Sequence, residues 1–251
     1  AECGPNQWEV NLRHSADARA ACDQAIRFKR IVKGVAHRAG VEATFMAKPY
    51  ADAPGSGMHL HVSLLDRDGA NVFASDDVMG NDTLKQAAAG LLETMGDAMA
   101  IFAPNANSYR RLRPELYVPM NATWGYNNRG VAVRVPVSGP ADRRLEHRVA
   151  GADANPYLVA AAVLAGMLHG IERKLAPPAP LAGNAYTQRL AAPRLPGDWP
   201  TALARFSASA FLAEYLGERF VTLYERTRRG EMNEFNSRIT ALDYAWYLEQ
   251  V

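Results

Sequence analysis

The 251-residue sequence has few cysteines and no long apolar run. Two cysteines, Cys3 and Cys22, are too few for a disulfide framework, which favours a reducing cytoplasm. No apolar stretch approaches the ~18 residues that a membrane-spanning helix needs, and the first residues lack a basic region followed by an apolar core. The sequence therefore predicts neither a membrane segment nor a signal peptide.

A strong charge of either sign is also missing. The chain has 28 lysines and arginines against 26 acidic residues, a formal balance of +2. Such a balance gives no field that argues for nucleic acid or an anionic membrane as a partner. With 48% apolar residues, the chain is long enough to bury a sizeable core. We therefore expect a globular protein whose arginines act locally.

Hydrophobic periodicity places strands in the middle of the chain, with helices before and after them. Helical spacing is found in residues 15–39, 81–102, 155–174, 199–216, 217–229 and 239–249. Strand-like spacing is found in residues 41–50, 58–66, 122–137 and 143–151. This order predicts an α+β domain built on an antiparallel sheet.

Two histidines lie two residues apart in GSGMHLHVSL, residues 55–64. In a strand, the side chains of His59, His61 and Ser63 leave the same face and share one space. A His-x-His pair occurs in many metal sites, and it is equally compatible with hydrogen-bonded core positions or a ligand contact.

Two carboxylates, Glu2 and Glu9, are separated by a Gly-Pro turn. Oxygen ligands of this kind suit Mg²⁺ or Mn²⁺, which often bridge to phosphate oxygens. The structural alternative is a pair of solvent-exposed glutamates near the start of the chain.

The alternating segment RLEHR sends Arg144, Glu146 and Arg148 to one face of a predicted strand. Two flanking guanidiniums keep a carboxylate ionised, and arginines hold carboxylates or phosphates in bidentate geometry. The alternative is a salt-bridge ladder on a solvated face, which is the commoner fate of such charges.

A series of arginines lies among Asn, Gly and Pro in loops and at strand ends: Arg110, Arg111, Arg113, Arg129 and Arg134. Loop arginines can form an anion-binding wall for a triphosphate, although a charged rim gives the same pattern. The chain has no P-loop or GxGxxG turn. Carboxylates, histidine and arginines together favour metal-assisted phosphoryl transfer on another kind of fold.

Five motifs follow one another in order: ECGPNQWE, FMAKPYADAPGSGMHLHVSL, NSYRRLRP, WGYNNRGVAVRVP and RRLEHRVAGADANPYL. Together they closely resemble the catalytic domain of the glutamine synthetase family, over nearly all of residues 1–175 and more weakly to the end. The resemblance implies that residues 1–251 are the C-terminal catalytic domain, with an antiparallel sheet flanked by helices. It also implies that the family's N-terminal β-grasp domain lies outside this chain.

The resemblance implies a reaction and its participants. Enzymes of this family use ATP and divalent metal, Mg²⁺ or Mn²⁺, to phosphorylate the γ-carboxylate of glutamate, and a nitrogen nucleophile then displaces the phosphate. The motifs assign metal binding to four residues: Glu2, Glu9, His59 and Glu146.

Substrate and nucleotide roles are carried over in the same way. The glutamate is assigned to Gly55, Arg111 and Arg148, and ATP to His61, Ser63, Arg129 and Arg134. Arg129 also matches an arginine that stabilises the transferring phosphoryl group.

Two positions depart from the family pattern. Counting along RLRPELYVP, Tyr117 replaces the flap glutamate that helps to bind ammonium and remove its proton, and Glu115 stands where glycine is usual. Tyrosine removes a negative charge and offers an aromatic contact to an alkyl amine, although it could simply pack on a neighbouring residue. Pro54 replaces an asparagine before the Gly-Ser-Gly turn, so one glutamate contact is lost or moved.

In lacking the flap acid, the sequence resembles the γ-glutamylpolyamine and γ-glutamylamide synthetase branch of the family. This resemblance implies a ligase that joins glutamate to a polyamine or monoamine, with Tyr117 as a catalytic-site residue. The alternatives are an ammonia-using glutamine synthetase and a non-catalytic relative that binds glutamate, ATP or an amine. We expect the full-length protein to form a ring-shaped homo-oligomer. Because the family's remaining metal-binding glutamates and a neighbouring subunit's aspartate precede this segment, we expect the 251-residue chain alone to be inactive.

Overall fold

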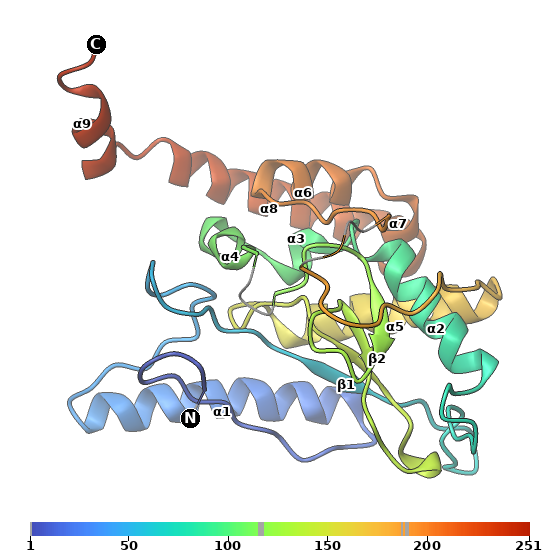
Figure 1. Ribbon diagram of the computed structural model, residues 1–251. Helices are drawn as coiled ribbons and strands as arrows, with labels where there is room; N and C mark the ends of the chain where they lie inside the picture. The colour runs from blue at the N-terminus through green and yellow to red at the C-terminus, as the bar shows by residue number, and fades with distance from the viewer. Residues whose placement is uncertain (1, 115–117, 187, 189–190) are drawn as a thin grey trace.

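A computed structural model describes residues 2–114, 118–186, 188 and 191–251, and it shows a small sheet surrounded by helices (Figure 1). The strands of the described residues are β1 (Leu60–Val62), β2 (Trp124–Tyr126), β3 (Val133–Val135) and β4 (Leu145–His147). The helices are α1 (Ala18–Arg38), α2 (Asp82–Thr94), α3 (Met99–Phe102), α4 (Ala106–Arg111), α5 (Pro156–Glu172), α6 (Trp199–Ser207), α7 (Ala210–Leu216), α8 (Glu218–Asn236), α9 (Ala241–Tyr247) and the 3₁₀ turn η1 (Pro140–Asp142).

The sheet has the strand order β1-β4-β3-β2. The β1–β4 and β3–β4 pairs are antiparallel, and the β2–β3 pair is parallel. The α+β prediction is confirmed, with a mixed sheet in place of a wholly antiparallel one. The parallel pair arises because the loop after β2 returns the chain to the level of Thr123, whose carbonyl accepts from the Val133 N–H at 3.0 Å.

The main core forms where α2 packs against α5, behind the sheet. Three glycines make this contact close: an added Cβ at Gly90 would lie 2.1 Å from the Gly166 carbonyl oxygen and 2.5 Å from the Gly170 nitrogen. No side chain fits such distances, so the two helix backbones touch directly. The glycines of α2 and α5 are therefore a packing requirement.

Several predicted elements differ from the observed ones: α8 continues to Asn236, beyond the predicted end at 229, and the segment 122–137 holds two strands, β2 and β3. The helix expected over 81–102 is broken between α2 and α3, and the helix expected over 199–216 is divided at Ser209, which starts α7 by accepting from the Leu212 N–H. The strand expected over 41–50 is absent from these described residues. There the backbone N–H and carbonyl of Lys48 bond to the Asn107 side chain, both at 2.9 Å, in place of a neighbouring strand.

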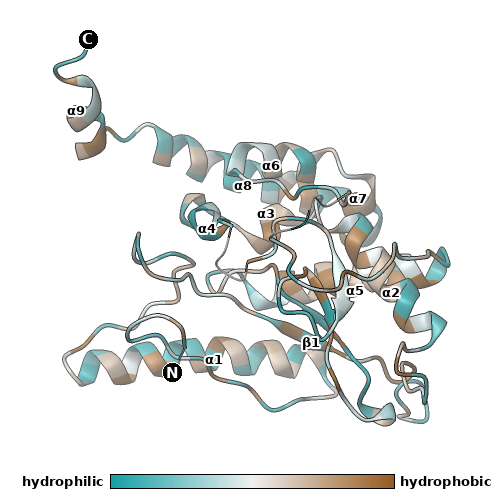
Figure 2. Cartoon of the chain, in the orientation of Figure 1, coloured by the Kyte–Doolittle hydropathy of each residue, from teal (hydrophilic) through white to brown (hydrophobic). Residues whose placement is uncertain are grey.

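Polar residues gather on the strands beside β1, in the middle of the molecule, whereas the C-terminal helix α9 projects away from the body (Figures 1 and 2). No helix among the described residues is both long and apolar enough to cross a bilayer. Cys3 is exposed and Cys22 is buried, and both are free thiols. The polar residues on these strands make up the candidate site.

The α2–α5 contact generates a stability prediction. Gly90→Ala places a methyl group on the α5 backbone, so we expect it to lower the free energy of unfolding by about 3 kcal/mol or more, as overpacking does in a tight core. Urea denaturation measures the change. The matched control is Gly230→Ala on α8, where nothing lies within 4 Å of the added Cβ. There we expect a gain of about 0.5–1 kcal/mol from helix propensity. Equal effects of the two variants would contradict this account.

Candidate active site

A row of polar side chains crosses three strands of the sheet. In the strand register, His61 on β1 lies opposite Glu146 on β4, and Glu146 lies opposite Arg134 on β3. Paired residues of neighbouring strands share a face, so the three side chains meet. His147 points to the other face, where it is buried with its ring centroid 4.4 Å from that of Phe102. The alternation predicted for RLEHR is therefore present.

Glu146 is the centre of this row, with 2% of its surface exposed. Its Oε2 accepts from Arg134 Nη1 at 2.8 Å, and its Oε1 accepts from Arg148 Nη1. Burial by itself raises the pKa of Glu146, but the Arg148 charge and the Arg134 hydrogen bond outweigh it and leave the pKa below its ordinary value. Glu146 is therefore an ionised carboxylate at neutral pH, and the solvated ladder is not what forms.

Both histidines of the HLH segment face this carboxylate. His59 Nδ1 lies 3.4 Å from Glu146 Oε1, and His61 Nε2 lies 3.9 Å from the same oxygen. Burial and the Arg148 charge lower the pKa of His59 to about 4, although a third of its side chain stays exposed. Burial also lowers the pKa of His61, against the pull of Glu146. Both imidazoles are thus neutral at pH 7, the form that binds metals.

The two N-terminal carboxylates form a pair of their own. Glu2 and Glu9 share a hydrogen bond, which lowers the pKa of Glu2 and raises that of Glu9. The charge of Glu146 adds to the increase at Glu9, so the pair lies close enough to the sheet site to sense its charge. A cation bound between two such carboxylates can take the place of the hydrogen bond that joins them.

The N-terminal segment is attached to the Gly-Ser-Gly turn by Gln7. Its Nε2 donates to the Gly55 carbonyl at 2.9 Å and to Ser56 Oγ at 3.3 Å, while its Oε1 accepts from the Gly4 N–H at 3.0 Å. Gln7 therefore holds the loop that carries Glu2 and Glu9 against the rest of the site. Gln7 was not among the residues predicted from the sequence; its place inside the first motif was the only signal.

The glycines of the same turn make room for Arg111. A Cβ at Gly55 would lie 2.7 Å from Arg111 Cγ, and one at Gly57 would lie 2.9 Å from Arg111 Nη2 and 3.5 Å from His59 Nε2. Arg111 is 4% exposed and donates from Nη1 to the Val149 carbonyl at 2.8 Å. Its guanidinium is thus a buried cation beside the histidine site, where it can take the carboxylate of a ligand.

The remaining predicted residues are placed less closely. Ser63 is half-buried just after β1. Arg129 is exposed in the β2–β3 loop, and within the described residues no hydrogen bond or ion pair joins it to the site. Arg110 and Arg113 are exposed, as a charged rim would be. Tyr117 and Glu115 lie outside the described residues.

Asn127 was not assigned a role from the sequence, and Arg144 differs from its prediction: Arg134 takes the place expected for Arg144 beside Glu146, while Arg144 bonds to His61. Arg134 Nη2 donates to Asn127 Oδ1 at 2.6 Å. Asn127 has a left-handed backbone with a φ of 48°, which asparagine tolerates well. Arg144 Nε donates to His61 Nδ1 at 3.3 Å. Asn127 thus orients Arg134. Because Arg144 donates to His61 Nδ1, the proton of the neutral His61 ring is on Nε2, the nitrogen that faces Glu146.

The donor set fits a divalent ion in chemistry but is incomplete. Within the described part of the chain, no three His, Cys, Asp or Glu side chains come together as a metal site. The donors stand as two pairs, Glu2 with Glu9 and His59 with Glu146. Carboxylates beside a neutral imidazole suit Mg²⁺ or Mn²⁺. An ion bound there would need further oxygen ligands from outside these pairs.

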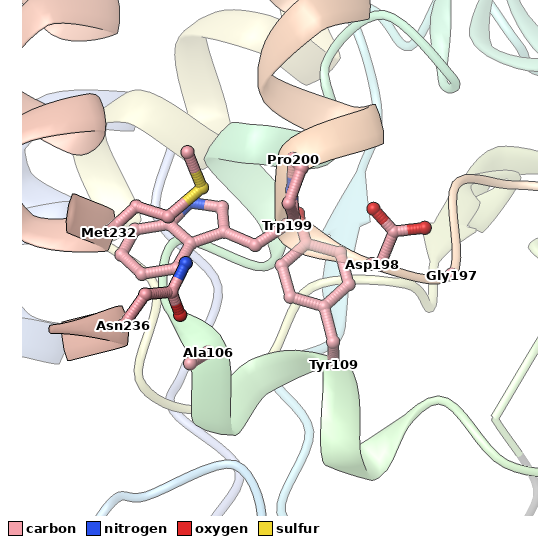
Figure 3. Close-up of a pocket in the computed structure, with 8 residues that line it drawn as sticks. All are labelled: Ala106, Tyr109, Gly197, Asp198, Trp199, Pro200, Met232 and Asn236. Atoms are coloured by element: carbon pink, nitrogen blue, oxygen red, sulfur yellow. The ribbon is translucent and has the colours of Figure 1, made fainter. Parts of the chain in front are cut away.

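A separate cavity of about 200 Å³ lies between α4, the start of α6 and α8 (Figure 3). It is lined by Ala106, Tyr109, Gly197, Asp198, Trp199, Pro200, Met232 and Asn236. The Tyr109 hydroxyl and the Trp199 indole N–H are buried and have no hydrogen-bond partner among the described residues. Such donors usually take ordered water, and none of the predicted site residues lines this cavity.

Comparison with known sequences identifies the family. Residues 1–247 match the family described as glutamine synthetase, catalytic domain. The chain is 43% identical over 250 residues to γ-glutamylputrescine synthetase PuuA of Escherichia coli K12, covering 99% of this chain and 52% of that protein. It is 38% identical over 253 residues to glutamate–isopropylamine ligase of a Pseudomonas species, covering 99% and 55%. A glutamine synthetase of Thermococcus kodakarensis is 36% identical over 262 residues, covering 99% and 58%.

A solved structure shows the same fold. The chain superposes on ligand-free GmaS with a TM-score of 0.85 at 34% identity, covering 93% of this chain and 54% of that one. The chain thus spans about half the length of the relatives it matches. Sequence motifs, the polar row on the sheet and the shared fold agree, and the chain belongs to the glutamine synthetase family.

Proposed function

We propose that this chain is the catalytic part of an ATP-dependent ligase that joins the γ-carboxylate of glutamate to an organic amine through γ-glutamyl phosphate. The observation that carries the proposal is the ionised Glu146, held by Arg134 and Arg148 beside the neutral His59 and His61. Ligases of the glutamine synthetase family use ATP and divalent metal ions. A buried carboxylate among imidazoles and guanidiniums is suited to that pair of reactants.

The chain's own residues bind and orient the reactants. Arg111 and Arg148 hold the two ends of an anionic substrate, and Arg134 offers positive charge where a phosphoryl group transfers. A divalent ion, when bound, polarises the phosphate oxygens. We assign glutamate binding to Gly55, Arg111 and Arg148, and nucleotide binding to His61, Ser63, Arg129 and Arg134. We assign metal binding to Glu2, Glu9, His59 and Glu146, and catalysis to Arg129 and Tyr117.

Two observations support the proposal that the acceptor is an organic amine. Relatives that match nearly all of this chain are named for putrescine and isopropylamine as the acceptors. In this sequence Tyr117 also stands where the family has an acid that handles ammonium. Loss of that negative charge favours an acceptor that binds through its alkyl part.

Enzymes named glutamine synthetase also match this chain, so ammonia is the alternative acceptor. We further propose that residues 1–251 correspond to the C-terminal catalytic domain of a protein with an N-terminal β-grasp domain. In that protein, assembly of a homo-oligomeric ring completes the site, and the 251-residue chain alone lacks ligase activity. Ligase turnover by the isolated chain would contradict this division of the site.

An acceptor assay on the full-length protein tests the proposed reaction. ATP-dependent phosphate release is measured with glutamate plus ammonium, putrescine, spermidine, ethanolamine or isopropylamine. We expect at least one organic amine to exceed ammonium in kcat/KM by about tenfold or more, because an alkyl contact contributes about 1–3 kcal/mol. Robust turnover with ammonium alone would exclude the amine preference. No phosphate release with any acceptor would exclude a ligase and favour a binding protein.

Glu146→Gln tests the centre of the site. We expect phosphate release to fall about 100-fold or more, because a metal ligand and the counter-charge of two arginines are lost together. Thermal unfolding measures the accompanying loss of stability, since Arg134 and Arg148 then face each other without an anion. The matched control is Glu93→Gln, which removes another carboxylate beside a histidine, 3.1 Å from His169 Nε2 on α5. A Glu93 variant as inactive as the Glu146 variant would contradict the assignment.

The two histidines are expected to differ in role. His59→Ala should abolish ATP-dependent phosphate release, because His59 is the proposed metal ligand beside Glu146. His61→Ala should instead raise the KM for ATP roughly tenfold while retaining turnover at saturating ATP, because one ligand contact of about 1.4 kcal/mol is lost. Steady-state kinetics at varied ATP separate the two outcomes. Identical kinetic defects in the two variants would mean that the two histidines do not have different roles.

A further inference from the structure

Arg111 lies at the end of α4, a helix of only six residues. A helix this short is not stable on its own, so contacts with the rest of the molecule must hold it. The Arg111 side chain is fixed relative to α4 because Gly55 leaves no free space beside its stem and the Val149 carbonyl accepts its Nη1. The contacts that orient α4 therefore also place the guanidinium.

One oxygen of Asp153 holds the first turn of α4. Asp153 Oδ2 accepts from Ser108 Oγ at 2.6 Å and from Asn105 Nδ2 at 2.9 Å. The same two residues form the capping box of α4: Asn105 Oδ1 accepts from the Asn107 and Ser108 N–H groups, and Ser108 Oγ accepts from the Asn105 N–H. Asp153 thus fixes the side chains that satisfy the start of the helix.

Asp153 also acts on Arg111 through its charge. Burial, together with the Arg148 charge, lowers the pKa of Arg111 to about 10, and the Asp153 charge opposes that shift. A buried guanidinium is costly without a counter-charge nearby. Asp153 supplies part of that charge without forming an ion pair with Arg111, so the guanidinium donors other than the Nη1 group bonded to Val149 stay available to a ligand.

The position of Asp153 is itself closely determined. Lys29 on α1 donates from Nζ to the Ala152 carbonyl at 2.6 Å and to the Ala154 carbonyl at 3.2 Å, on either side of Asp153. A Cβ at Gly151 would lie 2.4 Å from Asp153 Oδ1, so a larger residue there would displace the carboxylate from this position. The backbone on both sides of Asp153 is therefore held against α1.

We propose that Asp153 is a positioning residue: by holding Asn105 and Ser108 it orients α4 and places Arg111 for the carboxylate of the glutamate substrate. This inference rests on the proposed role of Arg111. It extends that role to a residue that does not touch the substrate, and it explains why a six-residue helix can present a buried cation at a fixed place.

Asp153→Ala in the full-length protein removes the acceptor and the charge. We expect the KM for glutamate to rise about tenfold or more, with the KM for ATP within about twofold and kcat little changed, since hydrogen bonds to a charged group are lost. Hydrogen exchange of the amides of residues 105–112 should become faster. Asp153→Asn keeps an acceptor oxygen, so its effect should be smaller. Equal increases in both KM values, or unchanged exchange, would overturn the proposal.

Two further variants test whether Asp153→Ala acts only by destabilising the protein. Gly151→Ala pushes the carboxylate aside without changing any charge, so it should raise the KM for glutamate as Asp153→Ala does. Asp17→Ala removes a capping carboxylate from α1, where Asp17 Oδ1 accepts from the Arg19 and Ala20 N–H groups. This control should lower the thermal midpoint slightly and leave both KM values unchanged. An Asp17 variant that raises the KM for glutamate equally would show that Asp153 acts only through stability.

A double-mutant cycle and the exchange measurement separate this inference from the proposed function. Ser108→Ala removes one of the two contacts of Asp153, so the effect of the double variant should be smaller than the sum of the single effects. Additive effects would contradict a shared contact. If the wild-type protein released no phosphate with any acceptor, the proposed function would fail. Faster exchange of α4 in Asp153→Ala would then still uphold the placement of Arg111.

Discussion

The carboxylate of Glu146 is buried in the sheet, and the surrounding site depends on how its charge is balanced. A buried anion costs several kcal/mol unless it is paired and hydrogen-bonded. Arg134 and Arg148 meet this requirement from two neighbouring positions, one on β3 and one just after β4. Because the pairing crosses strands, the sheet register and the charge balance depend on each other. Two cations against one anion also leave net positive charge, which suits phosphate and carboxylate ligands.

The same arrangement sets the state of the neighbouring groups. Burial and the arginine charges keep His59 neutral, and the Glu146 charge reaches the Glu2–Glu9 pair. On the other side of His59, Gly57 leaves room for the Arg111 guanidinium. Anionic and cationic groups therefore lie next to one another from the N-terminal segment through the sheet to α4. Such an arrangement of charges is suited to the metal ion and the two anionic substrates of the proposed reaction.

Much of this was predictable from local sequence. The periodicity of residues 15–39 and 155–174 predicted α1 and α5 with small errors at the ends, and the alternation in RLEHR predicted which side chains share a face. The breaks after α2 and at Ser209 were not predictable, because they depend on partners distant in sequence: Ser209 Oγ donates to Asp97 Oδ2 at 2.7 Å. The strand expected over 41–50 failed for the same reason, since Asn107 takes the backbone groups of Lys48.

By itself, the sequence determined the residue types of the site, their strand faces and the family, because motifs and periodicity are properties of neighbouring residues. Only the tertiary structure decided that Glu146 meets His61 and Arg134, that Arg111 is buried beside Gly55 and Gly57, and that Arg129 stays exposed. Strand register and the seating of a short helix are set by packing and by the cost of unpaired buried charge. Both arise from contacts between segments far apart in the chain.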